Sequence, residues 1–150
     1  MTNDGSERPS AQGMVETFHR TFGIVVNRTP TVVDEHTRAL RERLIQEEFD
    51  ELKEAMAQNN LIGIAKEMAD LLYVVYGTAV SYGIDMDPVF QEVHRSNMSK
   101  VGGHKRTDGK WVKPATYSTA SIEPILAEQT PQNERVVEPS DGIHEMFRGV

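Results

Sequence analysis

The stretch of residues 68–84 most constrains what this chain can fold into, because Asp70 is its only charged residue. In a helix with about 3.6 residues per turn this stretch is apolar on nearly every side, which is typical of the most buried element of a domain. It is shorter than the about 20 residues that a transmembrane helix needs, and it carries a carboxylate near its start. We therefore predict a central helix over residues 61–82 that ends at Gly83.

Apolar residues at three- and four-residue spacing predict further helices before and after this one. A short helix covers residues 14–22, and a long one starts after Asp34 as its N-cap and ends near residue 58. A fourth helix covers residues 87–99, where an Asp-Pro pair suits the N-cap and first-turn positions. Together these segments predict an all-helical core.

The segment that follows has a different pattern. Residues 101–117 contain glycines, a proline and no helical period, so we predict a loop, and we expect no set of strands. Residues 121–127 fit a last helical turn or two. The predicted fold class is therefore all-α, a helical bundle with a short N-terminal helix and a basic C-terminal loop and tail.

The chain length of 150 residues fits one domain with tails. We predict a flexible N-terminus over residues 1–12, one helical domain over residues 13–126, and a flexible C-terminal tail over residues 127–150. These boundaries follow the change from apolar helical patterns to segments rich in Ser, Asn, Gly and Pro.

Composition excludes several classes of protein. The chain has no cysteine, which rules out disulfides, thiolate metal sites and a cysteine nucleophile. Its net charge of -7 argues against nucleic acid as a partner, since polyanions need a basic surface. The polar N-terminus lacks the apolar core of a signal peptide. We predict a cytoplasmic protein with no membrane or nucleic-acid partner.

Two acidic clusters lie on the two longest predicted helices. They consist of Glu47, Glu48, Glu51, Glu67 and Asp70. Within each cluster the residues share a helical face, and Asp70 lies in the apolar run. A carboxylate in such surroundings is unfavourable unless a positive charge meets it, and carboxylates from two adjacent helices repel one another. Oxygen ligands suit a hard divalent cation, so we predict a metal site.

A solvated helix face is the alternative interpretation of these acids. Arg43 and Glu47 are four residues apart, as are Lys66 and Asp70, and both pairs could be ordinary ion pairs. The second cluster favours the metal site, because it lies on the helix that is least expected to have a solvated face.

The order of these acids resembles a known signature. Glu-Glu-x-x-Glu, followed on the next helix by Glu-x-x-Asp, is similar to the motif of the all-α nucleoside triphosphate pyrophosphohydrolases. That group includes MazG-like proteins, dimeric dUTPases and phosphoribosyl-ATP pyrophosphohydrolases. The segments ADLLYVVYG, VFQEVHRSNMSK and DGKWVKP resemble the MazG-related branch, and the resemblance covers about residues 14–126. It implies a four-helix core, dependence on Mg²⁺ or Mn²⁺, and a homodimer, with a tetramer as the alternative.

A basic segment follows the last long helix. Residues 100–117 carry five basic residues against one acidic residue, a local balance of +4. The predicted substrate-binding residues are Asn97, Lys100, Lys105, Arg106, Lys110 and Lys113. The resemblance implies that the first two face a nucleotide, and the others could form a lid that neutralises a triphosphate. The alternatives are a helix C-cap for the first two and an ordinary soluble loop for the rest.

The function implied is metal-dependent hydrolysis of a nucleoside triphosphate, such as dUTP, UTP or a non-canonical nucleotide, to the monophosphate and pyrophosphate. This would clean the nucleotide pool. Glu48 is the preferred general base over Glu47. Phosphoribosyl-ATP is another possible substrate, and a catalytically silent assembly or nucleotide-sensing module is an alternative. A di-iron bundle needs two Glu-x-x-His pairs, and only Glu16 and His19 have that spacing.

Overall fold

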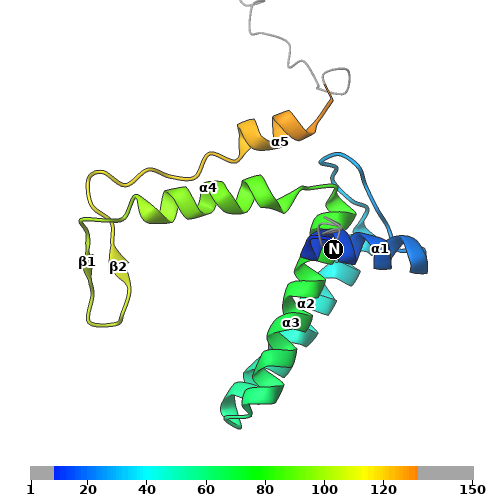
Figure 1. Cartoon of the computed structure of the whole chain (residues 1–150), viewed down its shortest axis with the longest axis horizontal. Coiled ribbons are helices and arrows are strands. Elements are labelled where there is room, and N and C mark those ends of the chain that lie inside the picture. Colours follow the sequence, from blue (N-terminus) through cyan, green and yellow to red (C-terminus); the bar gives the residue numbers. More distant parts are fainter. Residues whose placement is uncertain (1–8, 132–150) are drawn as a thin grey trace, which may run out of the picture.

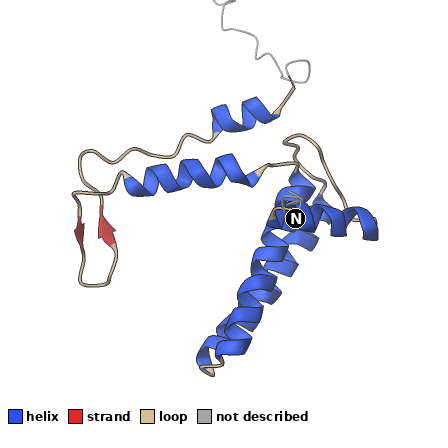
Figure 2. Ribbon diagram, viewed as in Figure 1, coloured by secondary structure: helices blue, strands red, loops and turns tan. Residues whose placement is uncertain are grey.

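A computed structural model describes residues 9–131 of the chain (Figure 1). Among these residues the elements are α1 (Ala11–Phe22), α2 (Glu35–Ala57), α3 (Leu61–Tyr82), α4 (Met86–Met98), β1 (His104–Lys105), β2 (Trp111–Val112) and α5 (Glu123–Gln129). Figure 2 shows that the regular elements joined by the loops are helices, apart from the short strands β1 and β2. The all-α prediction is confirmed. None of the helices in residues 9–131 combines the length and the apolar character needed to cross a bilayer.

The ends of the two long helices follow local sequence. Asp34 caps α2, where its side chain accepts a hydrogen bond of 2.9 Å from the Thr37 amide. Gly83 ends α3 with φ of 69°, a left-handed conformation in which an L side chain is strained. Both predicted ends are confirmed, because each depends on one residue whose chemistry suits a single position.

Two helices begin earlier than predicted. Ser10 caps α1 by accepting a 3.0 Å hydrogen bond from the Gly13 amide, so that helix starts at Ala11 and not near residue 14. Asp85, and not Asp87, caps α4. In each case a Ser or Asp upstream of the predicted start supplies the cap. The chain is also ordered past the predicted boundary at residue 126, since α5 ends at Gln129. The rest of the predicted tails, residues 1–8 and 132–150, lies outside the described residues.

The predicted loop contains a small hairpin. His104 pairs with Val112, and Lys105 pairs with Trp111, in an antiparallel two-stranded ladder. The prediction of a structureless loop was wrong here, because strands of two residues are too short for an alternating pattern to be detected. The Asp108-Gly109 pair at the turn was the available signal, with Gly109 at φ of 85°.

Helices α2 and α3 pack side by side along a regular seam (Figure 1). On α2 the buried and half-buried residues include the series Thr37, Arg41, Leu44, Glu48, Leu52 and Ala55. On α3 the corresponding series is Gly63, Glu67, Asp70, Val74, Gly77 and Ser81. Both series advance in steps of three or four residues, which is typical of packed helix pairs. The seam has carboxylates midway along both helices, where such packing ordinarily has apolar residues.

A buried polar cluster fills one end of the seam. The Arg41 side chain is only 4% exposed, and its guanidinium donates to the Val74 carbonyl at 3.0 Å and to the Thr78 hydroxyl at 3.3 Å. His19 of α1, 2% exposed, lies against the same place, and its Nδ1 donates to the Val25 carbonyl at 3.0 Å. Burial, and then the charge of Arg41, lower the pKa of His19. Gly77 leaves room for both side chains, and α1 is thereby joined to α2 and α3.

The short connection between α3 and α4 is held by two glutamines. Gln12 of α1 donates to the Ile84 carbonyl at 2.7 Å and accepts from the Met86 amide at 3.0 Å. Gln129 of α5 accepts from the Asp85 amide at 2.9 Å and donates to the Asp85 carbonyl at 3.0 Å. Each side-chain amide therefore satisfies one donor and one acceptor of the connection. This fixes the direction in which α4 leaves α3.

Helix α4 extends away from the α2 and α3 pair, and the chain after the hairpin returns along α4 to α5 (Figure 1). Several large apolar side chains are consequently exposed in the single chain, including Leu72 at 57%, Val75 at 37% and Phe90 at 70%. The prediction that α3 is buried from residue 68 onward holds only for its last part, where Gly77 and residues 79–81 are buried. Its middle lies open on one side because α4 does not cover it.

Candidate metal centre

Three of the five predicted ligands meet in the seam. Glu48 projects from α2 and Glu67 and Asp70 from α3, and one carboxylate oxygen from each lies within 4.8 Å of the other two. Glu67 and Asp70 are neighbours because they are three residues apart on a helix. Glu48 meets them because it occupies a seam position between Leu44 and Leu52. The packing that joins the two helices therefore also assembles the cluster.

The electrostatics of the cluster are those of crowded negative charge. Burial raises the pKa of Glu48, and the neighbouring carboxylates of Glu51, Asp70 and Glu67 raise it further. Lys66 opposes this shift in the pKa of Glu48. Its Nζ lies 2.7 Å from Asp70 Oδ2 and 3.1 Å from Glu67 Oε1. The sequence indicated only an ordinary pair with Asp70, so the contact with Glu67 is a finding of the structure.

The donor set fits a hard divalent cation. All three side chains offer carboxylate oxygens, which Mg²⁺ and Mn²⁺ prefer. The mutual repulsion of these acids, which adds to the effect of burial in raising the pKa of Glu48, points the same way, since a cation would offset that repulsion. These three residues could hold such an ion with ligands from two helices.

Asp70 is less buried than its sequence surroundings predict. Its side chain is 42% exposed, whereas that of Glu67 is 13% exposed. The prediction that Asp70 is the buried charge was wrong for the single chain, because the neighbouring Leu72 and Tyr73 are also exposed there. Glu67 is the acid with the least access to water on this helix face.

The two other predicted ligands lie at the edge of the cluster. Glu51 is exposed, but its charge acts on Glu48. Glu47 is directed to Arg43, with 3.9 Å between its Oε1 and the arginine Nε, and its side chain is 56% exposed. The structure therefore joins Glu48, and not Glu47, to the acids of α3.

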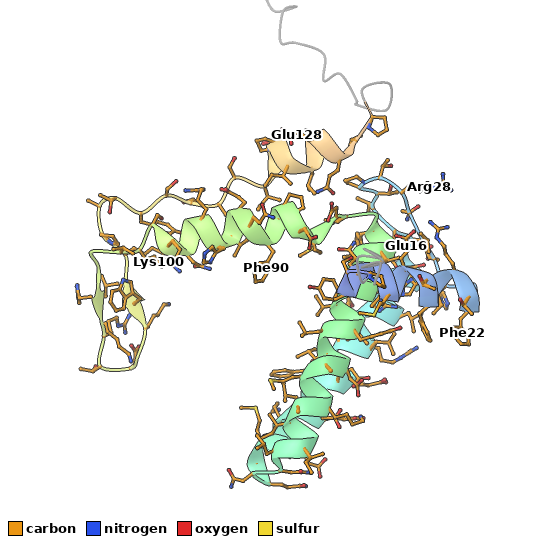
Figure 3. All side chains as sticks on the ribbon, in the orientation of Figure 1. Glu16, Phe22, Arg28, Phe90, Lys100 and Glu128 are labelled. Carbon is orange, nitrogen blue, oxygen red and sulfur yellow. The ribbon has the colours of Figure 1, made fainter. Side chains whose placement is uncertain are left out.

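The predicted substrate-binding residues lie at the far end of α4 from this cluster. Lys100 donates to the Asn97 side chain at 2.6 Å, and Figure 3 shows Lys100 where α4 meets the hairpin. Arg106 pairs with Asp108 at 3.0 Å, and the Lys113 ammonium lies 4.1 Å from the centre of the Tyr117 ring. Lys105 and Lys110 belong to the hairpin and its turn. Within one chain the end of α4 and the hairpin lie away from α2 and α3, the helices of the carboxylate cluster (Figure 1).

A cavity of about 610 Å³ lies beside the connection between α3 and α4. Its lining includes Glu16, Arg28 and Asp85, and it includes none of the predicted site residues. We therefore place the candidate site at the carboxylate cluster and not at this cavity, because the cluster has the ligand atoms that a metal ion needs.

Comparison with known proteins places the chain in a family. The model for phosphoribosyl-ATP pyrophosphohydrolase matches residues 15–97, which is more than half of the chain. The chain belongs to this family. The match includes both helices of the carboxylate cluster. The resemblance noted in the sequence is confirmed at this level, and placement in the MazG-like or dimeric dUTPase branch stays a prediction.

A viral protein is also similar to the chain. Uncharacterized protein L479 of Acanthamoeba polyphaga mimivirus is 38% identical over 86 residues, which cover 55% of this chain and 34% of that protein. The chain thus spans about a third of the length of this relative. The relative's name describes no activity.

The Glu48→Gln substitution should stabilise the metal-free protein. At pH 7 with a chelator present, we expect the free energy of unfolding to rise by roughly 0.5 kcal/mol, because one of several repelling charges is removed. Since the pKa of Glu48 is raised in the folded state, wild-type stability relative to the variant falls as pH rises through that pKa. The two proteins should become equal in stability below about pH 4. Urea unfolding at several pH values measures this.

Asp50→Asn is the matched control on the same helix. Gln46 and then Lys53 lower the pKa of Asp50, so its removal should have the opposite sign at pH 7. A loss of stability for Glu48→Gln at pH 7 in chelator would contradict the repulsion that the geometry indicates.

Proposed function

We propose that the protein hydrolyses a nucleoside triphosphate to the nucleoside monophosphate and pyrophosphate, with Mg²⁺ or Mn²⁺ as cofactor. The observation that carries the proposal is the meeting of Glu48, Glu67 and Asp70 from two helices that lie within the family match. Carboxylates grouped in this way favour a divalent cation, and a polyphosphate is the substrate whose charge the same cation can offset.

The acidic residues would have two roles, metal binding and general-base catalysis. Glu48, Glu67 and Asp70 would hold the ion, and Glu51 adds negative charge beside them. When bound, a divalent cation supplies positive charge next to the phosphate oxygens and lowers the pKa of a nearby water. Glu48 is our candidate for the general base that takes the proton from the attacking water, because it lies among the ligands whereas Glu47 is directed to Arg43.

Phosphoribosyl-ATP is the second candidate substrate, and the family match favours it. It carries the same triphosphate as ATP and would release the same pyrophosphate. The sequence segments that resemble MazG-related proteins favour a simple nucleotide such as dUTP, UTP or a non-canonical triphosphate, and thus a role in cleaning the nucleotide pool. In either case, contact of the residues from Asn97 to Lys113 with the phosphates would require a second chain, because within one chain they lie apart from the carboxylates.

We also propose that the active form is a homodimer in the cytoplasm. The exposed apolar side chains of α3 and α4 are the support for a dimer, because Leu72, Val75 and Phe90 would leave water on association. Phe90 projects from the side of α4 that is turned away from α5 (Figure 3). Sedimentation velocity should give twice the chain mass; a monomer at micromolar concentration would contradict the dimer, and a tetramer would extend it.

The test of activity is a substrate panel. Purified protein is incubated with Mg²⁺ or Mn²⁺ and with canonical, deoxy and modified triphosphates and phosphoribosyl-ATP, and the products are resolved by chromatography. Release of pyrophosphate supports the proposal, and the fastest substrate chooses between the two candidates. Release of orthophosphate contradicts it. Nucleotide binding without turnover would instead support the catalytically silent module.

A further inference from the structure

Lys66 places its ammonium group against two of the three acids of the carboxylate cluster. It precedes Glu67 on α3 and is four residues before Asp70, so a single ammonium group reaches both acids. Its Nζ is 3.1 Å and 3.2 Å from the two oxygens of Glu67 and 2.7 Å from Asp70 Oδ2. Two of the three acids that define the candidate metal site therefore already share a positive charge.

An ordinary surface lysine pairs with one acid and has little effect on anything else. Lys53 on α2 is such a residue, with its Nζ 3.4 Å from Asp50 and its side chain 61% exposed. Lys66 is exposed to nearly the same extent, at 63%, but one of its partners is Glu67, at 13%. The ammonium group is thus turned toward the seam between α2 and α3.

A divalent ion and this ammonium cannot share the same oxygens. Each carboxylate oxygen that accepts from Lys66 has one fewer lone pair for a metal, and the two positive charges would repel one another at such distances. The four-carbon stem of lysine lets the charge move by several ångströms without moving the helix. Binding of an ion in the cluster should therefore turn Lys66 outward along the rim of the site.

We propose that Lys66 is an exchangeable counter-ion: it neutralises Glu67 and Asp70 when no divalent ion is bound, and it contacts the phosphates of the ligand once the ion has displaced it. This inference rests on the proposed function. It adds that Lys66 pairs first with Glu67 and Asp70 and then with the ligand phosphates. Without metal, the Lys66 ammonium keeps the carboxylate cluster assembled. Once an ion is bound, the same ammonium lies at the edge of the cluster, where it can contact an approaching polyphosphate.

The test uses Lys66→Met and Lys66→Arg in the full chain, with Lys53→Met as the matched control. Isothermal titration with Mn²⁺ alone gives the metal affinity, and titration of pyrophosphate at saturating Mn²⁺ gives the phosphate affinity. For Lys66→Met we expect Mn²⁺ to bind roughly three- to tenfold more tightly, because a competing charge is removed. We expect pyrophosphate to bind more weakly by a similar factor, and Lys66→Arg to retain most of that affinity. Lys53→Met should match the wild type in both titrations.

The outcomes separate this inference from the proposed function. If the wild type binds Mn²⁺ and Lys66→Met binds it equally or less well, the exchange is wrong while the metal site stands. If pyrophosphate affinity is unchanged in Lys66→Met, the proposed contact between Lys66 and the phosphates is wrong. If the wild type binds no Mn²⁺, both the exchange and the proposed function fail. If the affinities change as expected but no nucleotide is hydrolysed, only the proposed function fails.

Discussion

Replacement of Asp70 by Asn, or of Glu67 by Gln, should lower kcat for nucleotide hydrolysis by at least about a hundredfold. Each change removes one negative charge from a set of three carboxylates within 4.8 Å, with almost no change in shape. A bound ion contributes several kcal/mol to stabilising the charge of a phosphoryl transition state, and each factor of ten in rate is about 1.4 kcal/mol. Steady-state kinetics at saturating Mg²⁺, together with Mn²⁺ titration calorimetry, measure both effects.

Asp50→Asn is the control for this experiment, because Asp50 lies on α2 but pairs with Gln46 and Lys53 outside the cluster. It should keep wild-type kinetics. Glu48→Gln should lose far more activity than Glu47→Gln, since only Glu48 lies with the acids of α3. Turnover by Asp70→Asn close to that of the wild type would exclude the carboxylate cluster as the catalytic metal site.

Gly77→Ala should have the largest effect on stability. A Cβ atom at this position would lie closer to Arg41 Nη2 than van der Waals radii allow, and 2.9 Å from His19 Nε2. Both neighbours are buried and held by hydrogen bonds, so neither can move aside without losing a partner. Overpacking of this kind costs about 1–3 kcal/mol, and we expect the upper part of that range in urea unfolding.

A double variant tests the cause of this loss. Arg41→Ala removes the closest neighbour of the new methyl group, so Gly77→Ala should be much less destabilising in that background than in the wild type. Equal losses in both backgrounds would contradict the clash, and would indicate that some other property of Gly77 is responsible.

The long helices could be predicted because their ends depend on single residues. Asp34 and Gly83 each act within one turn of the chain, and the structure has them where the sequence indicates. The start of α4 was harder to predict, because Asp85 and Asp87 are both capable caps and the choice depends on the connection that Gln12 and Gln129 hold. Local sequence identifies the candidate N-cap residues, and tertiary hydrogen bonds determine which of them caps the helix.

The sequence predicted which acidic residues could form the site, but it predicted only in part which of them meet in space. Helical spacing brings Glu67 and Asp70 together, but whether Glu47 or Glu48 joins them depends on which face of α2 meets α3. That face contains Arg41, which is a charged residue in a buried position and obscures the apolar pattern. The sequence preferred Glu48 over Glu47 as general base, and the pattern of three- and four-residue steps from Thr37 to Ala55 is the signal that places Glu48 in the seam.

The two glutamines that hold the connection between α3 and α4 lie on either side of the segment by which the family is recognised. That segment covers residues 15–97, whereas Gln12 precedes it and Gln129 follows it by more than thirty residues. A fragment cut to the matched residues would leave the peptide groups from Ile84 to Met86 without these partners. The family match covers residues 15–97, but the residues that determine the direction of α4 extend from Gln12 to Gln129. The segment that identifies the family is therefore shorter than the segment needed to orient this helix.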